Sequence, residues 1–365
     1  MTVTGQGEFA RVRALVLAHG WNSTAYQVVN PGISHWFSRA GDAVVGYADC
    51  GAVWVVAGAP VASEARLAAV VAEFEAVAAQ AGASVCYFGA EARLERICRA
   101  RPDRAFVTLG AQPCWDPAAW PGILARHASL RGQLARARNK GVVVARWEPA
   151  RAHEHPALRA CLAEWLATRG LPPLRFLTTP FTLGRLVDRL VFVAEREGRV
   201  VGFLVASPVP ARGGWLVEQV VRGAGAPNGT AELLLDAAFR AMIAAGSGYV
   251  TLGLAPLSTR GGSGGRIDPW WLRWTLRWAR AHGRRFYDFD GLDRFKAKFD
   301  PEWWEPVFAV TDQPAFRPRM LYAVAQAFSD NAPIRLVATA LVRALRQELS
   351  WAVAGHREGD GTRQE

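Results

Sequence analysis

The sequence has little of what metal binding or covalent catalysis requires. Its 365 residues contain five cysteines, which are scattered and form no Cys-x-x-Cys pair: Cys50, Cys86, Cys98, Cys114 and Cys161. Reduced thiols in a cytoplasmic protein are the simplest interpretation. His153 and His155 lie two positions apart and would not share a helical face, and no Ser-His-Asp pattern stands out. We therefore predict no metal site, no cofactor and no serine hydrolase chemistry.

Long hydrophobic runs are also absent. The most apolar window, 43–62, is interrupted by Asp49, several glycines and Pro60, which indicates a hairpin of buried strands and not a membrane span. The N-terminal segment has too short an apolar core for a signal peptide. We expect a cytoplasmic protein whose membrane contact, if any, is peripheral at the inner face of the cytoplasmic membrane.

Acidic residues are missing from one stretch of an already basic chain. The net charge is +11, and residues 117–147 contain no Asp or Glu. The segment 127–141 predicts a helix that ends at Gly141, with an apolar side formed by Leu130 and Leu134. Such a helix can contact RNA phosphates, and the predicted tRNA-binding residues are Arg131, Arg136, Arg138 and Lys140. An ordinary solvated helix face is the alternative, and DNA is not an expected partner.

A repeated pattern indicates an internal duplication. The run GAPVAS at 58–63, a helix and AGASVCYFG at 81–89 parallel GAPNGT at 225–230, a helix and AGSGYVTLG at 245–253. Two α/β halves with mixed sheets are expected, although chance similarity between two alanine-rich units remains an alternative. The predicted domains are a first half at 1–125, a basic helix and strand at 126–150, a second half with the donor site at 151–312, and a helical extension at 313–365.

The stretch 215–258 is the predicted donor site. A strand carrying Glu218, Gln219 and Arg222 leads into a loop, then a helix from Thr230, then a second strand that ends at a proline break. The free N–H groups of a helix N-terminus favour an anion, so a phosphate-bearing substrate is expected there. The loop residues Asn228, Gly229 and Thr230 would bind it through the backbone.

The region after Ser258 combines a glycine-rich loop with many aromatic residues. A helix with Trp270, Trp271, Trp274 and Trp278 either packs in a core or lines a lipid-sized groove. Strands are expected at 285–289 and 307–311, and Lys296 and Lys298 alternate as on a surface strand. The helical region beyond residue 312 either packs or lies at a membrane interface.

Four of these motifs resemble one family. LGLAPLS at 252–258, APNG at 226–229, SLRGQLARARNKG at 129–141 and FKAKFDPEWWEP at 295–306 are similar to the C-terminal catalytic domain of lysyl-phosphatidylglycerol synthases, the multiple peptide resistance factors. The resemblance implies tandem GNAT-like (acetyltransferase-like) domains. It also implies transfer of an aminoacyl group from aminoacyl-tRNA to a hydroxyl of an anionic lipid such as phosphatidylglycerol. Within these motifs, Ser258, Lys296, Lys298 and Glu305 are the further predicted substrate contacts.

The sequence departs from the family pattern in two places. The family's large transmembrane half has no counterpart, which predicts a stand-alone soluble member. Gln219 stands where the family has an aspartate, while Arg222 is kept. Glu218 would point to the opposite face of a regular strand and could replace that aspartate only if a β-bulge redirects it.

The predicted catalytic residues are Glu218, Gln219, Arg222 and Tyr287. Arg222 is assigned to the phosphate or adenosine end of the tRNA, and Glu218 or Tyr287 to proton transfer. A structural ion pair for Arg222 and a core position for Tyr287 are the alternatives. Two other functions stay open at this point: an acyl-CoA-dependent N-acyltransferase of the GNAT type, and a non-catalytic RNA- or membrane-binding relative.

Overall fold

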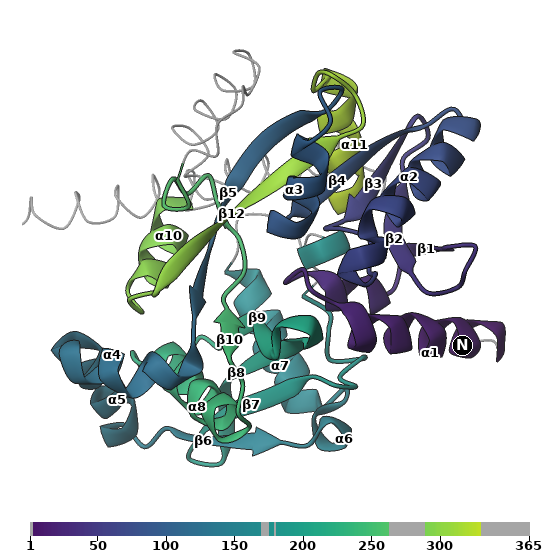
Figure 1. Ribbon diagram of the computed structural model, residues 1–365. Helices are drawn as coiled ribbons and strands as arrows, with labels where there is room; N and C mark the ends of the chain where they lie inside the picture. Colours follow the sequence, from purple (N-terminus) through teal and green to yellow (C-terminus); the bar gives the residue numbers. More distant parts are fainter. Residues whose placement is uncertain (1–2, 169–174, 179, 263–288, 330–365) are drawn as a thin grey trace, which may run out of the picture.

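The computed structural model describes residues 3–168, 175–178, 180–262 and 289–329. These residues form a mixed sheet with helices on both faces (Figure 1). The strand order is β1-β2-β3-β4-β12-β5-β10-β9-β8-β7-β6, and β11 pairs with β5 outside this path. The predicted mixed α/β fold is confirmed.

The elements have the following bounds. The strands are β1 (Ser34–Phe37), β2 (Val44–Asp49), β3 (Val53–Ala57), β4 (Ser84–Ala90), β5 (Ala105–Trp115), β6 (Val143–Trp147), β7 (Leu190–Arg196), β8 (Arg199–Val209), β9 (Gly214–Arg222), β10 (Tyr249–Thr251), β11 (Ala255–Pro256) and β12 (Trp303–Thr311). The α-helices are α1 (Val3–His19), α2 (Glu64–Gln80), α3 (Ala92–Arg99), α4 (Trp120–Arg126), α5 (Ala128–Asn139), α6 (Pro149–Ala152), α7 (Pro156–Ala167), α8 (Thr230–Ala244), α10 (Phe289–Ala297) and α11 (Pro318–Phe328). Short 3₁₀ helices are η1 (Ala25–Val29), η2 (Pro117–Ala119), η3 (Phe176–Thr178) and η4 (Pro210–Arg212).

Each half is a three-layer sandwich because its central strands are apolar on both faces. In β3, Val53 and Val55 pack toward α1 and α11, whereas Trp54 and Val56 pack toward α2. In the second half, the residues of β7 alternate in the same way between a core under α5 and α8 and a core under α7. Burial on both faces holds the sheet rigidly between helices.

The two repeated segments have the same local structure. β3–α2–β4 and β9–α8–β10 are both strand–helix–strand units whose two strands pair in parallel. The shared Ala-Gly pair ends each helix with a glycine of positive φ, 72° at Gly82 and 70° at Gly246. This geometry supports the predicted duplication.

Strands β5 and β12 join the halves into one sheet (Figure 1). β12 lies between β4 and β5, and the C-terminal end of β5 pairs with β10. A strand from the second predicted domain thus completes the sheet of the first. The proposed domain limits at 125, 150 and 312 remain predictions.

Two expected strands differ from the structure. The strand expected to continue to Ser258 is already interrupted after Thr251, and the chain pairs again only as β11. Lys296 lies on helix α10, so the prediction of a surface strand there was wrong. Phe295 and Phe299 are four residues apart with ring centroids 5.1 Å apart, a spacing that fits a helix and outweighs the alternation of the two lysines.

Several predictions lie outside the described residues. They concern Tyr287, the four tryptophans of 270–278, most of the expected strand 285–289 and the helical region beyond 329. Within the described ranges, no helix is long and apolar enough to cross a lipid bilayer.

Candidate functional site

The sheet opens between β9 and β10. These strands share three residue pairs, ending at Thr251 and Leu216, after which the chain leaves β9 and pairs with β5 as β11. β9 continues to Arg222, and in the described part of the chain this extension pairs only with β8. β9 and β10 thus part at this point of the sheet.

A β-bulge at Glu218 lies on this extension. Val205 is opposite Gln219 and Ala206 is opposite Val217, so Glu218 has no residue across from it on β8. Glu218 accepts a hydrogen bond of 2.9 Å from Arg189, and Gln219 accepts one of 3.3 Å from Thr182. Both side chains thus reach the same segment, 182–189. The bulge that the sequence analysis required for Glu218 is present.

Glu218 is held in a buried ion pair. The side chains of Arg189 and Glu218 are 1% and 6% exposed, and Arg189 also donates to Asn30 of the first half at 2.9 Å. Glu218 Oε1 takes the Arg189 hydrogen bond, whereas buried Oε2 has no hydrogen-bond partner among the described residues. Since a buried carboxylate oxygen rarely stays unpaired, Oε2 is the atom of Glu218 that can accept a further hydrogen bond.

The loop 223–229 of the predicted donor site follows Arg222, which is exposed at the end of β9. The loop is fixed by the Gly223 N–H, which donates to Val201 O at 2.9 Å, and the Ala224 N–H, which donates to Glu164 Oε2 at 3.0 Å. Arg222 therefore extends from a rigid base into solvent, where it can reach an anion.

Helix α8 begins in close contact with α5. Gly229 has φ 97°, and a Cβ at this position would meet the carbonyl oxygen of Gln133 at 2.1 Å. The Thr230 hydroxyl donates to Pro227 O at 2.7 Å, while Asn228 is exposed. Gly229, the N-cap residue, has no side chain to cap the first turn of α8. Any anion bound here would therefore meet backbone N–H groups and Asn228, and not the Thr230 hydroxyl.

Lys296 is buried against the segment that follows β10. Its Nζ donates to the carbonyl oxygens of Leu252, Gly253 and Leu254 at 2.7, 2.7 and 2.8 Å. Burial lowers the pKa of Lys296 to about 7, against the opposing charge of Asp293. Three acceptors require three N–H donors, which only the ammonium form supplies. Lys296 thus holds the chain where it turns away from β9.

Lys298 pairs with a different part of the site. Its ammonium contacts Glu232, which lies in the first turn of α8 and is itself nearly buried. Lys298 thus neutralises the charge of Glu232 at the N-terminal end of α8, where the sequence predicts an anion to bind. Lys298 is one third exposed, so it also faces solvent there.

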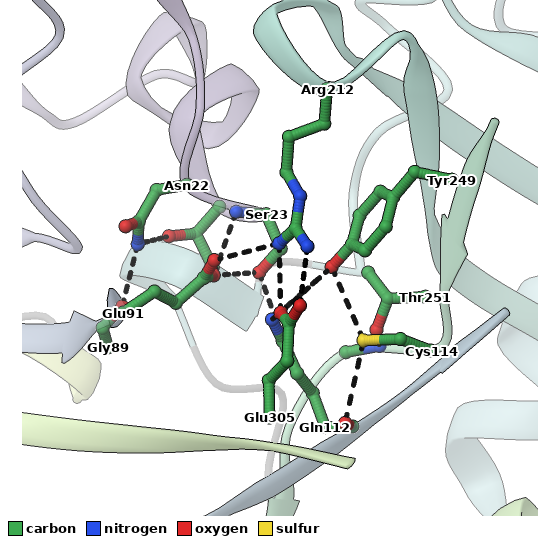
Figure 2. Close-up of polar contacts among 12 residues, drawn as sticks. Asn22, Ser23, Gly89, Glu91, Gln112, Cys114, Arg212, Tyr249, Thr251 and Glu305 are labelled. Atoms are coloured by element: carbon green, nitrogen blue, oxygen red, sulfur yellow. Dashed lines mark hydrogen bonds and ion pairs between the residues drawn. The ribbon is translucent and has the colours of Figure 1, made fainter. Parts of the chain in front are cut away.

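Glu305 belongs to a polar cluster at the junction of the two halves (Figure 2). Arg212 donates to Glu305 Oε2 at 2.8 Å, approaches Glu91 Oε2 at 3.6 Å and stacks on the ring of Tyr249 at 3.5 Å. Although burial opposes it, pairing with Arg212 lowers the pKa of Glu305 to about 2. Gln112 adds a hydrogen bond to Glu305 at 3.0 Å. One guanidinium thus connects strands from both halves.

Glu91 has the opposite environment within this cluster. It is 1% exposed, and this burial raises its pKa to about 7 against the hydrogen bonds from Ser23 and the charge of Arg212. Oε1 accepts from the Ser23 N–H at 2.8 Å and from its hydroxyl at 2.6 Å, whereas Oε2 has no hydrogen-bond partner in the part of the chain that the structure describes. Glu91 can thus change its protonation near neutral pH.

Glu91→Gln should therefore change how stability depends on pH. The pKa of about 7 in the fold exceeds the ordinary 4.5, so the folded chain binds more protons between these values and its stability falls as pH rises through them. We expect the variant to unfold with a free energy about 3 kcal/mol higher than the wild type at pH 8, and nearly equal at pH 5. Urea unfolding at both pH values measures this. An equal difference at the two values would contradict it.

Sequence reasoning missed Glu91, Arg212, Gln112 and Tyr249. They come from four separate elements and share no motif, so only the folded sheet brings them together. The one local signal is Glu91, a lone acidic residue between a buried strand and a helix, at the N-cap of α3. Ser258, which was predicted, is buried, and its hydroxyl accepts only a long hydrogen bond, 3.4 Å, from the Arg260 N–H.

The basic helix α5 presents its charges on two sides. Arg131 donates to the carbonyl oxygens of Leu124 and Ala125, and Arg138 pairs with Asp236 of α8 at 2.9 Å. Arg136 and Lys140 lie on another side of the helix and are exposed. The predicted apolar back is confirmed, since Leu130 and Leu134 are buried.

The structure thus places Glu218, Gln219 and Arg222 together on β9 and Lys296 against residues 252–254, where the chain leaves β9. The predicted basic residues lie apart from them, on or directly after α5. Glu305 instead lies in the junction cluster, and Tyr287 is outside the described residues. In the described ranges, no three His, Cys, Asp or Glu side chains are grouped so that they could hold a metal ion.

Comparisons with known proteins identify relatives. The C-terminal domain of a putative lysylphosphatidylglycerol synthetase from Agrobacterium fabrum is 24% identical, with 90% of this chain and 98% of that chain covered and a TM-score of 0.75. L-PGS from Bacillus licheniformis is 22% identical, with 87% and 95% covered and a TM-score of 0.73. Both likenesses establish the fold. A comparison with curated proteins gave no significant match. Residues 13–311 match the family described as "Phosphatidylglycerol lysyltransferase, C-terminal", so the chain belongs to this family of transferase domains.

Proposed function

We propose that this protein transfers an aminoacyl group from aminoacyl-tRNA to a hydroxyl of an anionic phospholipid of the phosphatidylglycerol type. The observation that carries the proposal is the family match over residues 13–311. The amino acid is left open, because its selection depends on a pocket built from several segments. The proposed place of action is the cytoplasm, with peripheral contact at the inner membrane face.

The opening in the sheet is the proposed donor site. Arg222 and the start of α8 would bind a phosphate of the terminal nucleotides, with Asn228 beside them. The backbone of β9 beyond Leu216, where β9 parts from β10, would hold the aminoacyl group. Arg136 and Lys140, on the exposed side of α5, would contact phosphates farther along the RNA.

The chemistry exchanges one ester for another. The lipid hydroxyl oxygen attacks the aminoacyl carbonyl carbon, and its proton passes to a base, for which Glu218 Oε2 and Tyr287 are the candidates. The ribose oxygen leaves when the tetrahedral intermediate collapses, and the proton is returned to it. Binding both substrates in reach of each other supplies much of the rate increase. Lys296 and Glu305, which are engaged by protein partners, act as positioning residues in this scheme.

The test supplies the full chain with a pool of tRNAs charged with radiolabelled amino acids, together with phosphatidylglycerol vesicles. We expect label in the organic phase, identified as aminoacyl lipid by mass spectrometry, and no such product with uncharged tRNA plus free amino acids. If label appears only with acyl-CoA donors and CoA raises the melting temperature, the protein is an N-acyltransferase instead. Binding to RNA or vesicles without turnover would identify a non-catalytic relative.

A further inference from the structure

A cavity in the second half is lined by residues of α4, α5 and α8. Helix α5 packs against both α4 and α8, and Figure 1 shows the three helices next to one another. Its volume is about 370 Å³, within the range of about 300–1,000 Å³ usual for small-molecule sites. The floor is aliphatic, formed mainly by Leu124, Ala125 and Leu134. We call this cavity, together with its rim, the α4–α5–α8 groove.

The rim of the groove carries three guanidinium groups, those of Arg131, Arg138 and Arg240. Asp236 is the one carboxylate paired with this rim in the described structure, and it serves both Arg138 and Arg240 at 2.9 Å. It is also fixed by the indole N–H of Trp120, at 2.9 Å. The side chains of Arg138 and Arg240 are 54% and 58% exposed, so part of each fork of donors faces outward. The rim therefore has more positive charge, from three arginines, than the single buried carboxylate of Asp236 neutralises.

From this geometry we infer that the α4–α5–α8 groove binds an anionic phospholipid of the membrane. The guanidinium groups would bind its phosphate, and the aliphatic floor would take the adjoining glycerol and acyl carbons. The inference takes its lipid class from the proposed function. It adds a binding site apart from the β9–β10 opening and a role for Arg240 in membrane docking.

RNA fits this groove less well than lipid. Single-stranded nucleic acid is usually held by aromatic rings on which bases stack, and the described lining includes no aromatic side chain. Arg131 and Arg138 are seven residues apart and share one side of α5, whereas Arg136 and Lys140 lie on a different side. The helix can thus offer one basic side to lipid and the other to RNA.

The test measures binding of the full chain to sedimented vesicles, without any transfer reaction. Vesicles contain phosphatidylcholine with or without one quarter phosphatidylglycerol. Because a basic residue near an anionic surface contributes about 1 kcal/mol, Arg240→Ala should weaken binding to the anionic vesicles about fivefold. The matched control is Arg199→Ala, an exposed arginine at the start of β8 and outside the groove, which should stay within twofold.

A second pair of variants separates the groove from overall charge and from misfolding. Ala125→Asp places a carboxylate in the groove at an exposed position and should also weaken binding about fivefold. Ala128→Asp adds the same charge at an exposed position outside the groove, and should bind as the wild type does. The inference would be overturned if each groove variant and its control lost vesicle binding equally. It would also be overturned if neither Arg240→Ala nor Ala125→Asp weakened vesicle binding. Loss of tRNA binding with unchanged vesicle binding would assign the groove to RNA.

The inference and the proposed function can fail separately. Vesicle binding that depends on Arg240 but without aminoacyl transfer would keep the groove and reject the reaction. Transfer to a soluble short-chain phosphatidylglycerol that is unaffected by Arg240→Ala would keep the reaction and leave docking as the groove's role.

Discussion

Replacing Arg222 with alanine is expected to lower kcat/KM for aminoacyl transfer by about 100- to 1,000-fold. The side chain is exposed at the end of β9 and the loop that follows is anchored independently, so its loss should leave the fold intact. A charge-assisted contact to a phosphate or a developing oxyanion contributes about 3–4 kcal/mol to transition-state stabilisation, which corresponds to this rate effect. Initial rates with labelled aminoacyl-tRNA and phosphatidylglycerol vesicles measure it.

The control for this prediction is Arg199→Ala, which removes an exposed arginine at the start of β8, at the same end of the β8–β9 pair as Arg222, and should keep the wild-type rate. Arg222→Lys should recover part of the activity, since it keeps the charge but not the fork of donors. Thermal unfolding checks that all three variants fold. Activity of Arg222→Ala within threefold of the wild type would show that Arg222 has no part in the reaction.

Replacing Lys296 with methionine is expected to destabilise the fold by about 1–3 kcal/mol, because it leaves buried carbonyl oxygens without a donor. The loss is partly offset, since the substitution also removes the buried charge whose desolvation lowers the pKa of Lys296. The lysine is 6% exposed, and its ammonium satisfies the carbonyl oxygens of 252–254. Methionine fills a similar volume but donates no hydrogen bond. Urea unfolding at pH 6, where the wild-type ammonium is present, measures the change.

Lys140→Met is the matched control, since Lys140 is exposed on α5 and should change stability by less than about 0.5 kcal/mol. Lys296→Arg tests the same contact by geometry, because a larger guanidinium does not fit a cradle occupied by a compact ammonium. A loss below 1 kcal/mol for Lys296→Met would mean that the three carbonyl groups are satisfied by other means.

The parts of the candidate site that depend on local sequence could be predicted. The start of α8 at Thr230 follows from its loop and apolar periodicity, and the buried Leu130 and Leu134 follow from helical spacing. The strand predicted around Lys296 failed because two alternating lysines suggest a period of two, while the spacing of Phe295 and Phe299 follows a helix and their packing decides. The bulge at Glu218 could be stated only as a condition, since register depends on the neighbouring strand.

The junction cluster shows why other parts could not be predicted. Arg212 meets Glu305 and Glu91 across large sequence separations, and each residue alone resembles an ordinary surface charge. Their burial follows from β12 inserting between β4 and β5, a pairing that no local pattern specifies. The perturbed pKa values of Glu91 and Glu305 arise from that burial and pairing.

By itself, the sequence determined the mixed α/β architecture, the repeated strand–helix–strand unit, the start of α8 at Thr230 and the basic side of α5. These depend on periodicity, capping glycines and charge, which act over a few neighbouring residues. The tertiary structure alone decided the parting of β9 from β10, the partners of Glu218 and Lys296, and the α4–α5–α8 groove. These depend on contacts between distant segments, whose geometry is set by how the whole sheet packs against its helices.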